Sequence, residues 1–376
     1  MKGVQFENKG AELMLQTLVH EFSSEKVKIV LAPGLNSSYS DRAKVGAYQL
    51  FNISKGKYDF NRVSYLIPKK LRGWLNNWFG IVFESDLTCV LDASGFAYGD
   101  QWPELNSERV AKQVSRLKRA GKKYIFLPQA FGPFSREFDF ENMQKAISLA
   151  ELTFARDIVS FNHVKKMNDT VYQSPDFTCL TSFESVKSPK QSFCIIPNSN
   201  MVADRADNRG FSLEKYCNVI VELSRLLTEK GYKINLFNHE GASDSHICQT
   251  ISSLLSEKMI AHEYFSGYDA LATKKFIATQ SLVFSSRFHG CVSALSQSVP
   301  CIGTTWSHKY EELFSYYGMN EFLIKNTTSF EEIEALISKY ILDNDQLVLM
   351  LKEAKSLNVN ESQKMIDLVK KSIGLV

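Results

Sequence analysis

The chain has 376 residues, of which 44% are hydrophobic and 23% are charged, a composition typical of globular proteins with sizeable cores. At roughly 100 to 200 residues per domain, this length predicts two domains. The 44 Lys and Arg residues and the 41 Asp and Glu residues leave a formal net charge of +3. Such a balance excludes a protein whose main role is to bind nucleic acid.

The first half of the chain alternates short apolar runs with amphipathic stretches. The runs 27–32, 87–92 and 124–128 are predicted to be buried strands, and 107–120 is predicted to be the helix between the last two. A strand, a helix and a second strand in this order are typical of α/β proteins with parallel sheets.

The stretch 68–80 combines basic residues with aromatic and aliphatic ones. In chain order these are Lys69, Lys70, Arg72, Trp74, Leu75, Trp78 and Phe79. Such a mixture can rest on an anionic bilayer or bind a phosphorylated lipid head group. The more common arrangement is a solvated basic loop that leads into an aromatic helix facing the core. Both interpretations stay open at this point.

The second half repeats the alternation over a longer stretch. Its predicted strands are 192–197, 232–238, 282–285 and 301–305. Its predicted helices are 212–231, 244–257, 269–280 and 289–298. Strands that are apolar throughout and separated by helices belong to parallel sheets covered on both faces. The chain is therefore predicted to be an α/β protein with two Rossmann-like domains.

The polar run 182–191 interrupts this pattern just before a new strand, and we expect the two domains to be joined there. It divides the chain into an N-terminal domain, 1–185, and a C-terminal domain, 186–328. The tail 329–376 is expected to form two or three helices that pack back across the junction. Because ligands of such folds bind at the carboxyl ends of the strands, we expect the active site in the cleft between the two sheets.

The cysteines and the N-terminal residues indicate where the protein resides. Seven cysteines occur without a CxxC pair, which favours reduced thiols and a cytoplasmic location. The first ten residues are polar and no run of about 18 apolar residues occurs, so neither a secretion signal nor a membrane-spanning helix is expected. No HExxH motif and no clustered Cys and His pattern is present, so neither a metal nor a cofactor is expected.

The segment 285–290 carries the densest group of chemically active residues. It follows a predicted strand and opens a predicted helix, whose first amide groups favour an anion. Arg287 can hold a carboxylate or phosphate through two hydrogen bonds, and the His289 imidazole can exchange a proton near neutral pH. Ser286 and Gly290 are the adjoining candidate substrate contacts. The alternative is a buried histidine that only satisfies a backbone group.

Several short motifs resemble those of the polysaccharide pyruvyl transferase family. The family's Arg-x-His-Gly segment is similar to Arg287, His289 and Gly290, and a similar turn follows at 298–300, with Lys309 downstream. Further matching residues form an Arg-Asp-x-x-Ser segment, a Pro-Asp pair, a Gln-x-x-Gly-Pro turn and a glycine turn: Arg156, Asp157, Ser160, Pro175, Asp176, Gln129, Gly132, Pro133, Ser94, Gly95 and Phe96.

The resemblance extends from about residue 34 to about residue 319. It implies a two-domain fold like that of GT-B glycosyltransferases, with the acceptor bound by the N-terminal domain and the donor by the C-terminal domain. It also implies transfer of a pyruvyl group from phosphoenolpyruvate to two hydroxyls of a sugar, which forms a ketal during surface-polysaccharide biosynthesis. A lipid-linked sugar acceptor would fit a peripheral membrane contact through 68–80.

Each residue type has a use in that reaction. Phosphoenolpyruvate carries a carboxylate and a phosphate, so its site needs cations, which Arg287 can supply. Protonation of the enol carbon needs an acid, for which His289 is the best-placed residue. His239, followed by Glu240 and Asp244, resembles a His-plus-acid segment of the family. The alternative for Asp244 is that it only caps the next helix.

Further candidates for substrate binding follow other predicted strands. Asp92 can hold a sugar hydroxyl or form a turn with the residues after it. Asn36 lies in the first strand-to-helix turn, and Asn198 follows the first strand of the second half. Arg156 and Asp157 can form an ion pair in a cleft, although such pairs are more often structural.

One position departs from the family pattern. Members often carry an arginine where this chain has Asn200. Either Arg205 or Arg209 then supplies the missing cation, or the donor site is altered. Two rival functions are a nucleotide-sugar glycosyltransferase of the same architecture and a non-catalytic partner in polysaccharide assembly. Asn200 favours the non-catalytic partner, whereas Arg287 and His289 oppose it.

Overall fold

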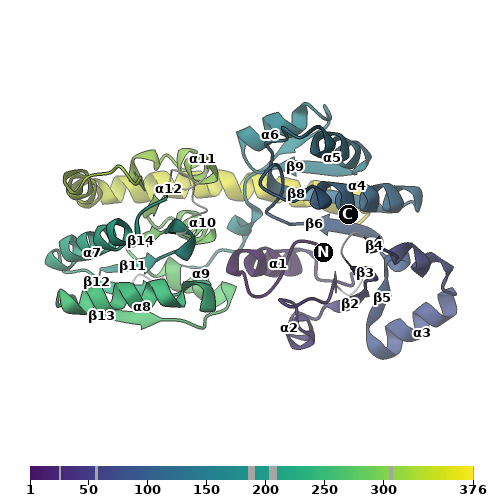
Figure 1. The fold of residues 1–376 in the computed structure, drawn as a ribbon, viewed down its shortest axis with the longest axis horizontal. Coiled ribbons are helices and arrows are strands. Elements are labelled where there is room, and N and C mark those ends of the chain that lie inside the picture. The colour runs from purple at the N-terminus through teal and green to yellow at the C-terminus, as the bar shows by residue number, and fades with distance from the viewer. Residues whose placement is uncertain (25–26, 56–57, 185–190, 203–209, 305–307, 376) are drawn as a thin grey trace. The chain divides into compact units, whose positions relative to one another are not determined.

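The computed structural model describes residues 1–24, 27–55, 58–184, 191–202, 210–304 and 308–375. The chain divides into two compact units (Figure 1). Unit 1 comprises Met1–Phe177 and Glu361–Val376, and unit 2 comprises Thr178–Asn360. Most of the predicted junction lies outside the described residues, as do Arg205 and Arg209.

Unit 1 contains mostly short, parallel strands. They are β1 Val30–Leu31, β2 Tyr48–Phe51, β5 Ile81–Phe83, β6 Cys89–Asp92, β7 Phe96–Tyr98, β8 Lys123–Phe131, β9 Leu152–Ala155 and β10 Tyr172–Gln173, with an antiparallel pair of β3 Ser54–Lys55 and β4 Tyr58–Asp59. The hydrogen-bonded orders are β1–β2–β5 and β10–β9–β8–β6, with β7 beside β8. The Met1 nitrogen donates to the Val30 carbonyl and the Lys2 amide to the Leu91 carbonyl, both at 2.8 Å. Residues 1 and 2 therefore bridge the two groups of strands.

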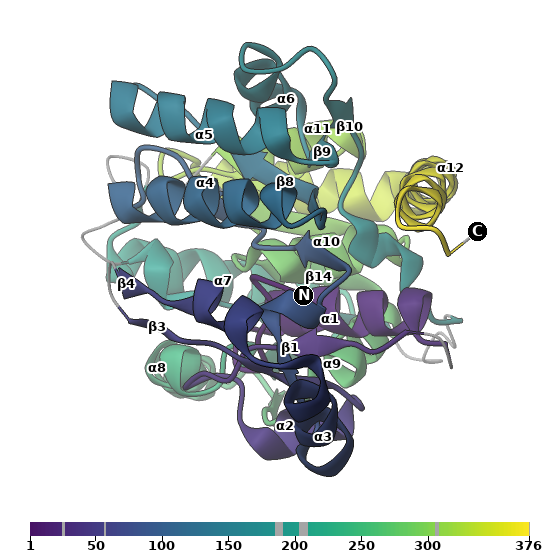
Figure 2. The ribbon, with the colours of Figure 1, turned by 90° about the vertical axis from the view of Figure 1, so that its right-hand side faces the viewer.

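Helices connect and cover these strands. They are α1 Lys9–Phe22, α2 Tyr39–Lys44, α3 Lys69–Phe79, α4 Glu104–Arg119, α5 Glu137–Leu149 and α6 Ile158–Lys165. Figure 2 shows α4 and α5 side by side, and their apolar faces enclose a core with β6, β8 and β9. In contrast, α3 has no buried residue.

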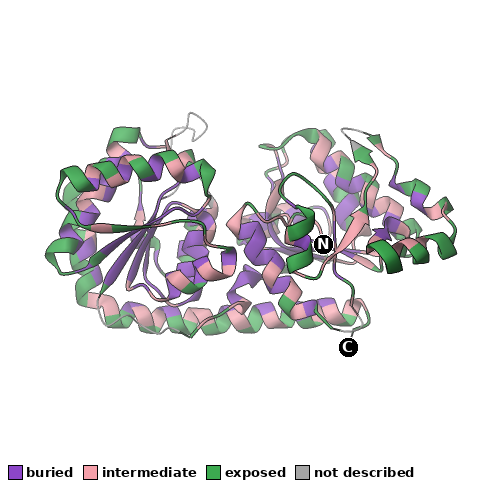
Figure 3. Cartoon of the chain, turned by 90° about the horizontal axis from the view of Figure 1, so that it is seen from below, coloured by how far each residue is buried: buried purple, intermediate pink, exposed green. Residues whose placement is uncertain are grey.

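Unit 2 contains a six-stranded parallel sheet. Its strands are β11 Ser192–Ile196, β12 Lys233–Phe237, β13 His262–Phe265, β14 Leu282–Ser285, β15 Cys301–Thr304 and β16 Leu323–Ile324. Its helices are α7 Leu213–Glu229, α8 Ala242–Glu257, α9 Ala270–Ala278, α10 Phe288–Ser296 and α11 His308–Tyr316. Figure 3 shows the buried strands with helices on both sides, as expected for parallel strands that are apolar throughout. The predicted strands at β11, β12, β14 and β15 and the helices between them are confirmed, whereas β13 and β16 were not predicted.

The order of the strands in unit 2 indicates where a ligand site belongs. The sheet has the order β13–β12–β11–β14–β15–β16. From β11 the chain adds β12 and β13 on one side, and it then crosses to the other side of β11 to add β14, β15 and β16. This is the strand order of Rossmann folds, in which ligands bind at the carboxyl ends of the strands where the order reverses. In unit 2 that position lies between the ends of β11 and β14.

The tail of the chain forms one helix, α12 Phe330–Ser372, where two or three were predicted. Its residues as far as Asn360 belong to unit 2, and those from Glu361 belong to unit 1. Its N-terminus carries a capping box, because the Ser329 hydroxyl accepts from the Glu332 amide at 3.3 Å and the Glu332 carboxylate accepts from the Ser329 amide at 2.7 Å. Among the described residues, no helix combines the length and apolar character that crossing a bilayer requires.

The packing of β15 yields a test of this architecture. A methyl group added at Gly303 would lie 2.5 Å from the Phe314 ring and 3.0 Å from Leu323. We expect Gly303→Ala to lower the free energy of unfolding by about 1 to 3 kcal/mol, because the buried ring must shift. Denaturant titration followed by circular dichroism measures this change.

The matched control is Gly73→Ala in α3, where an added methyl group meets no atom within 4 Å. This substitution should leave the free energy of unfolding unchanged or raise it by up to about 1 kcal/mol, because alanine favours a helix. Equal stability of the two variants would contradict the packing of β15 against α11.

Candidate active site

Predicted site residues gather at the carboxyl ends of three neighbouring strands of unit 2. Asn198 follows β11, His239 follows β12, and the segment Ser286 to Gly290 follows β14. Because β12, β11 and β14 are adjacent and parallel, their carboxyl ends meet at one edge of the sheet. The order of the strands therefore brings these residues to one edge of the sheet.

A buried hydrogen-bond network fixes the ends of β11 and β14. The Tyr216 hydroxyl accepts from the Asn198 amide at 3.1 Å and donates to the Ser286 hydroxyl at 2.7 Å. The Asn198 side-chain amide donates to the Ser286 carbonyl at 3.0 Å, and the Tyr310 hydroxyl donates to the same carbonyl at 2.8 Å. Asn198 and Ser286 are only 2% and 0% exposed, so their contacts favour a positioning role over the substrate contact predicted for them.

Beside this network, Arg287 forms a two-pronged ion pair with Asp244. The Nε and Nη2 atoms of Arg287 donate to the two carboxylate oxygens of Asp244 at 2.9 and 2.6 Å. The remaining nitrogen, Nη1, lies 3.7 Å from Glu240. Burial alone would lower the pKa of Arg287, but the two carboxylates outweigh it and raise the pKa. The guanidinium is charged and held in place, and its charge is shared with two carboxylates.

Asp244 does more than cap a helix. The N-cap of α8 is Gly241, and Asp244 lies in the first turn with its side chain completely buried. Besides Arg287, it accepts a hydrogen bond from the Ser199 amide at 3.1 Å. Asp244 thereby joins the turn after β11 to the turn after β14, and the interpretation as a simple cap is wrong.

The two histidines lie beside Glu240. The His239 Nδ1 atom is 3.6 Å from the Glu240 carboxylate. Burial would raise the pKa of Glu240, but the hydrogen bond and charge of His239, the charge of Arg287 and the charge of His289 lower it. Glu240 is therefore a carboxylate at neutral pH, placed among one arginine and two imidazoles. The sequence indicated this acid only through the family resemblance.

His289 and Lys309 flank the ring of Phe288. His289 is half-buried in the first turn of α10 and meets that ring edge to face, with centroids 5.4 Å apart. The Lys309 amine lies 5.1 Å from the same ring centroid. Gly290 has a steric role, because a methyl group there would lie 2.3 Å from the Ser285 hydroxyl. Unit 2 thus brings Arg287, His289 and Lys309 into one neighbourhood.

Unit 1 contains Asp92, whose contacts favour the turn-forming alternative. Its carboxylate is fully buried and accepts from the Ser94 hydroxyl and amide, from Tyr98 at 2.7 Å and from Tyr124 at 2.5 Å. The Lys2 amine lies 3.4 Å away. Burial would raise the pKa of Asp92, but Lys2 and the hydrogen bonds outweigh it and lower the pKa. Both carboxylate oxygens are therefore engaged inside the fold.

The other motif residues of unit 1 also hold the backbone. Asp157 caps α6 by accepting from the Ser160 amide at 2.7 Å, and the Ser160 hydroxyl accepts from the Phe131 amide at 2.9 Å. Arg156 and Asp176 form a buried ion pair at 3.4 Å. These contacts agree with the structural interpretation of the Arg-Asp-x-x-Ser segment.

Asn36 and Asn200 are the exposed members of the predicted set. The Asn36 side chain reaches solvent just beyond β1, while its carbonyl accepts from the Phe6 amide at 2.9 Å. Asn200 is also exposed, and its amide donates to the Asn198 side chain at 3.0 Å. Among the described residues, no group of three or more His, Cys, Asp or Glu side chains could hold a metal ion.

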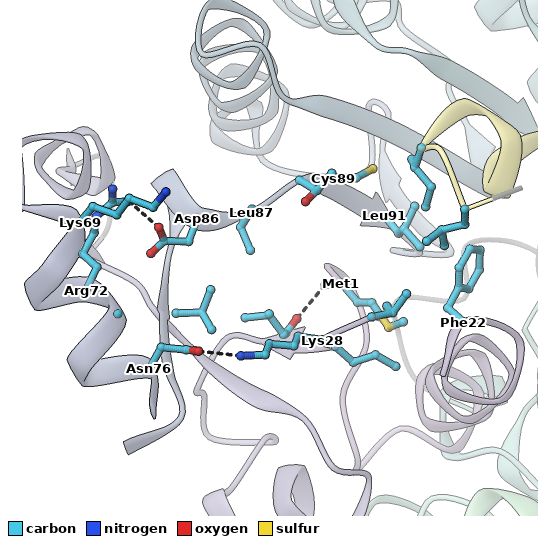
Figure 4. Close-up of a pocket in the computed structure, with 18 residues that line it drawn as sticks. Met1, Phe22, Lys28, Lys69, Arg72, Asn76, Asp86, Leu87, Cys89 and Leu91 are labelled. Carbon is cyan, nitrogen blue, oxygen red and sulfur yellow. Dashed lines mark hydrogen bonds and ion pairs between the residues drawn. The ribbon is translucent and has the colours of Figure 1, made fainter. Parts of the chain in front are cut away.

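A cavity that the sequence did not reveal lies in unit 1 beneath α3 (Figure 4). Its volume is about 570 Å³, and it adjoins the amino ends of β1 and β6, opposite to the strand ends that bind ligands in α/β folds. Lys69 and Arg72 line one end, and Phe22 and Leu91 line the other. Cys89 also lines the cavity, and burial raises the pKa of its thiol to about 12.

The Arg287–Asp244 pair yields a prediction about stability. Asp244→Asn should lower the free energy of unfolding by roughly 3 to 5 kcal/mol, because it leaves a largely buried guanidinium without its closest counter-charge. The double variant Asp244→Asn/Arg287→Met should recover part of that loss. Thermal and denaturant unfolding measure both, and additive losses in the double variant would show that the pair is not coupled.

Asp92 yields a prediction about acid stability. Its folded-state pKa lies below the ordinary value of 3.8, so its contribution is complete above that value and disappears as the pH falls further. Asp92→Asn should therefore be less stable than the wild type at neutral pH and lose less stability on acidification. Asp169→Asn, at a carboxylate that is 97% exposed, is the control and should follow the wild-type curve.

Comparisons of structure relate the fold to sugar-nucleotide enzymes. UDP-GlcNAc 2-epimerase from Neisseria meningitidis, solved with UDP-GlcNAc, is similar with a TM-score of 0.62 at 11% identity, over 97% of this chain and 98% of that one. MnaA from S. aureus, solved with UDP, has a TM-score of 0.58 at 14% identity, over 98% and 95%. Anabaena HepE, solved with UDP and glucose, has a TM-score of 0.54 at 9% identity, over 99% and 98%. These similarities confirm the predicted GT-B-like fold.

Comparisons of sequence identify the family. No match to the curated proteins was found. The family model for polysaccharide pyruvyl transferases matches residues 8–308, a range that contains the motifs around Arg156 and Arg287. Because this match covers most of the chain, the protein belongs to the polysaccharide pyruvyl transferase family and is a transferase.

Proposed function

We propose that this protein transfers a pyruvyl group from phosphoenolpyruvate to two hydroxyls of a sugar, forming a pyruvate ketal in surface-polysaccharide biosynthesis. The observation that carries the proposal is the cluster of Arg287, His289 and Lys309 at the switch point of a Rossmann sheet. A donor that carries a carboxylate and a phosphate needs such cations, and a proton transfer to its carbon needs such an acid.

In this proposal Arg287 binds the donor with the part of its guanidinium that Asp244 does not engage. Asp244 occupies Nε and Nη2, and the 3.7 Å from Nη1 to Glu240 exceeds a normal hydrogen bond. Nη1 can therefore donate hydrogen bonds to a carboxylate or phosphate of the donor. Lys309 and the first amides of α10 are the other groups that can meet the donor's charge.

His289 is the proposed acid. It donates a proton to the methylene carbon of phosphoenolpyruvate, which leaves an oxocarbenium-like centre at the adjoining carbon. A sugar hydroxyl attacks this carbon and loses its proton, the bond to the phosphate oxygen breaks, and the second hydroxyl closes the ketal ring. Glu240 and His239, which lie beside one another, are the candidates to accept the hydroxyl protons.

The acceptor belongs to unit 1 in this proposal, and the donor belongs to unit 2. The exposed Asn36 side chain, just beyond β1, supports a polar contact for the sugar. We further propose that the acceptor is lipid-linked and that the protein acts in the cytoplasm, where its seven free thiols would stay reduced. In the same proposal, Arg205 or Arg209 supplies the further cation that the family pattern places at the position of Asn200.

Isothermal titration with phosphoenolpyruvate and with UDP tests the donor. UDP is the competing ligand because solved proteins of the same fold bind it. Binding of phosphoenolpyruvate together with formation of a ketal on a lipid-linked saccharide would support pyruvyl transfer. Binding of UDP without binding of phosphoenolpyruvate would favour a nucleotide-sugar transferase, and binding of neither would favour a non-catalytic partner.

Two substitutions separate the roles within the cluster. Arg287→Lys keeps the charge but loses the planar fork, so donor binding should weaken by roughly 1 to 3 kcal/mol. His289→Ala should lower turnover by roughly 100- to 10,000-fold while donor affinity changes little. The controls are Arg225→Lys and His246→Ala, at exposed positions on α7 and α8. Equal and small effects at Arg287 and His289 would argue against these roles.

A further inference from the structure

The helix α3 has an inverted polarity. Its polar face, formed by Lys69, Arg72, Gly73 and Asn76, lines the cavity of unit 1 (Figure 4). Two contacts hold this face: Arg72 pairs with Asp86 at 2.6 Å, and the Asn76 side chain accepts from the Lys28 amine at 2.8 Å. An ordinary surface helix turns its apolar face inward and its polar face to solvent, which is the reverse of this arrangement.

The apolar face of α3 points to solvent. Leu71, Trp74 and Trp78 follow one another at spacings of three and four residues, and they are 48%, 51% and 75% exposed. Phe79 extends this face and packs edge to face against Trp74, with ring centroids 5.4 Å apart. Leu66, in the 3₁₀ helix η1 before α3, is 83% exposed. In Figure 3 the ribbon of α3, at the right-hand end, carries no buried segment.

Basic residues border this apolar face. Residues 60–83 contain Arg62, Lys69, Lys70 and Arg72 and no acidic residue. Arg72 is neutralised by Asp86, whereas Arg62, Lys69 and Lys70 are exposed and form no ion pair among the described residues. The apolar stripe therefore lies within a positively charged segment.

We propose that this α3 surface, formed by Leu66, Leu71, Trp74, Trp78 and Phe79 with Lys70 at its border, docks on an anionic lipid bilayer. A helix with an aromatic and aliphatic face and lysines at its border lies in the plane of the membrane interface. Tryptophan rings favour the depth of the head groups, and the lysines are attracted to anionic lipids. A protein partner fits less well, because lysine is depleted from protein–protein interfaces.

The contacts inside unit 1 suit this role. The ion pair of Arg72 with Asp86 and the hydrogen bond of Asn76 with Lys28 tie the inner face of α3 to the segments that follow β5 and precede β1, so that lipid binding at the outer face needs no rearrangement. The inference does not depend on the transferred group, because no residue of the α3 surface belongs to the site in unit 2. Failure of either proposal would therefore leave the other intact.

Flotation of the full-length protein with lipid vesicles tests the inference. We expect binding to vesicles of equal parts phosphatidylcholine and phosphatidylglycerol, and much weaker binding to phosphatidylcholine alone or at high salt. Trp74→Ser/Trp78→Ser should abolish binding together with the blue shift of tryptophan fluorescence. Lys69→Glu/Lys70→Glu should weaken binding by at least roughly 30-fold, because each lysine near an anionic surface contributes about fivefold.

The matched controls carry the same changes elsewhere. Leu342→Ser/Leu349→Ser alters two exposed leucines of α12, and Lys230→Glu/Lys258→Glu alters two exposed lysines of unit 2. Both should bind vesicles like the wild type, and all variants should unfold like the wild type. Equal binding by the α3 variants, or no vesicle binding by the wild type, would overturn the inference. Loss of self-association in the tryptophan variant without any vesicle binding would assign the surface to a second copy of the chain instead.

Discussion

The buried ion pair between Arg287 and Asp244 links three loops of unit 2. Arg287 follows β14, Asp244 opens α8 after β12, and the same carboxylate holds the Ser199 amide after β11. These three strands are neighbours, so one carboxylate connects the turns on both sides of the switch point. If the pair were broken, the turn that carries His289 would lose its fixed position relative to Glu240. Any chemistry at this edge of the sheet depends on that constraint.

Unit 1 also contains a buried carboxylate with a cationic partner. Asp92 is also fully buried at the carboxyl end of β6, where Lys2 balances its charge and two tyrosine hydroxyls donate hydrogen bonds to it. In each unit a desolvated carboxylate collects donors from segments far apart in the chain, which offsets the cost of burying its charge. The difference lies in the cation: Arg287 reaches the edge of the sheet, whereas Lys2 belongs to the residues that bridge the strands.

The sequence predicted β11, β12, β14 and β15 of unit 2, because each is a continuous apolar run followed by an amphipathic helix. It did not predict β13, which contains His262 and Glu263, or β16, which spans only two residues. It also placed Arg287 and His289 correctly at a strand end, since the local order of strand, turn and helix determines that position. The pairing of Arg287 with Asp244 could not be predicted, because it joins residues 43 positions apart through tertiary structure. The role of Asp92, as a sugar contact or a turn-forming residue, could not be decided from the sequence for the same reason. Its partners Lys2 and Tyr124 come from two other segments.

Unit 1 was harder to predict because strands such as β1 and β10 span only two residues, too few for a periodic pattern. For 68–80 the spacing indicated an amphipathic helix but not the direction of its apolar face. The interpretation as a core-facing aromatic helix is wrong, because no residue of α3 is buried and its side chains that line the cavity beneath it are polar, with Arg72 and Asn76 bonded to Asp86 and Lys28. The spacing of apolar residues shows that a helix is amphipathic, whereas the neighbouring elements of the fold determine which of its faces packs against the protein.

The position of Cys89 has a practical consequence. Six of the seven cysteines are buried, and Cys89, which lines the cavity beneath α3, is the one that is partly accessible. Its thiol remains protonated at neutral pH because burial raises its pKa to about 12, so a maleimide will react with it only slowly. Attachment of a spectroscopic label at Cys89 therefore requires a long reaction at alkaline pH. Such a label would report on the contents of the cavity without any engineered residue.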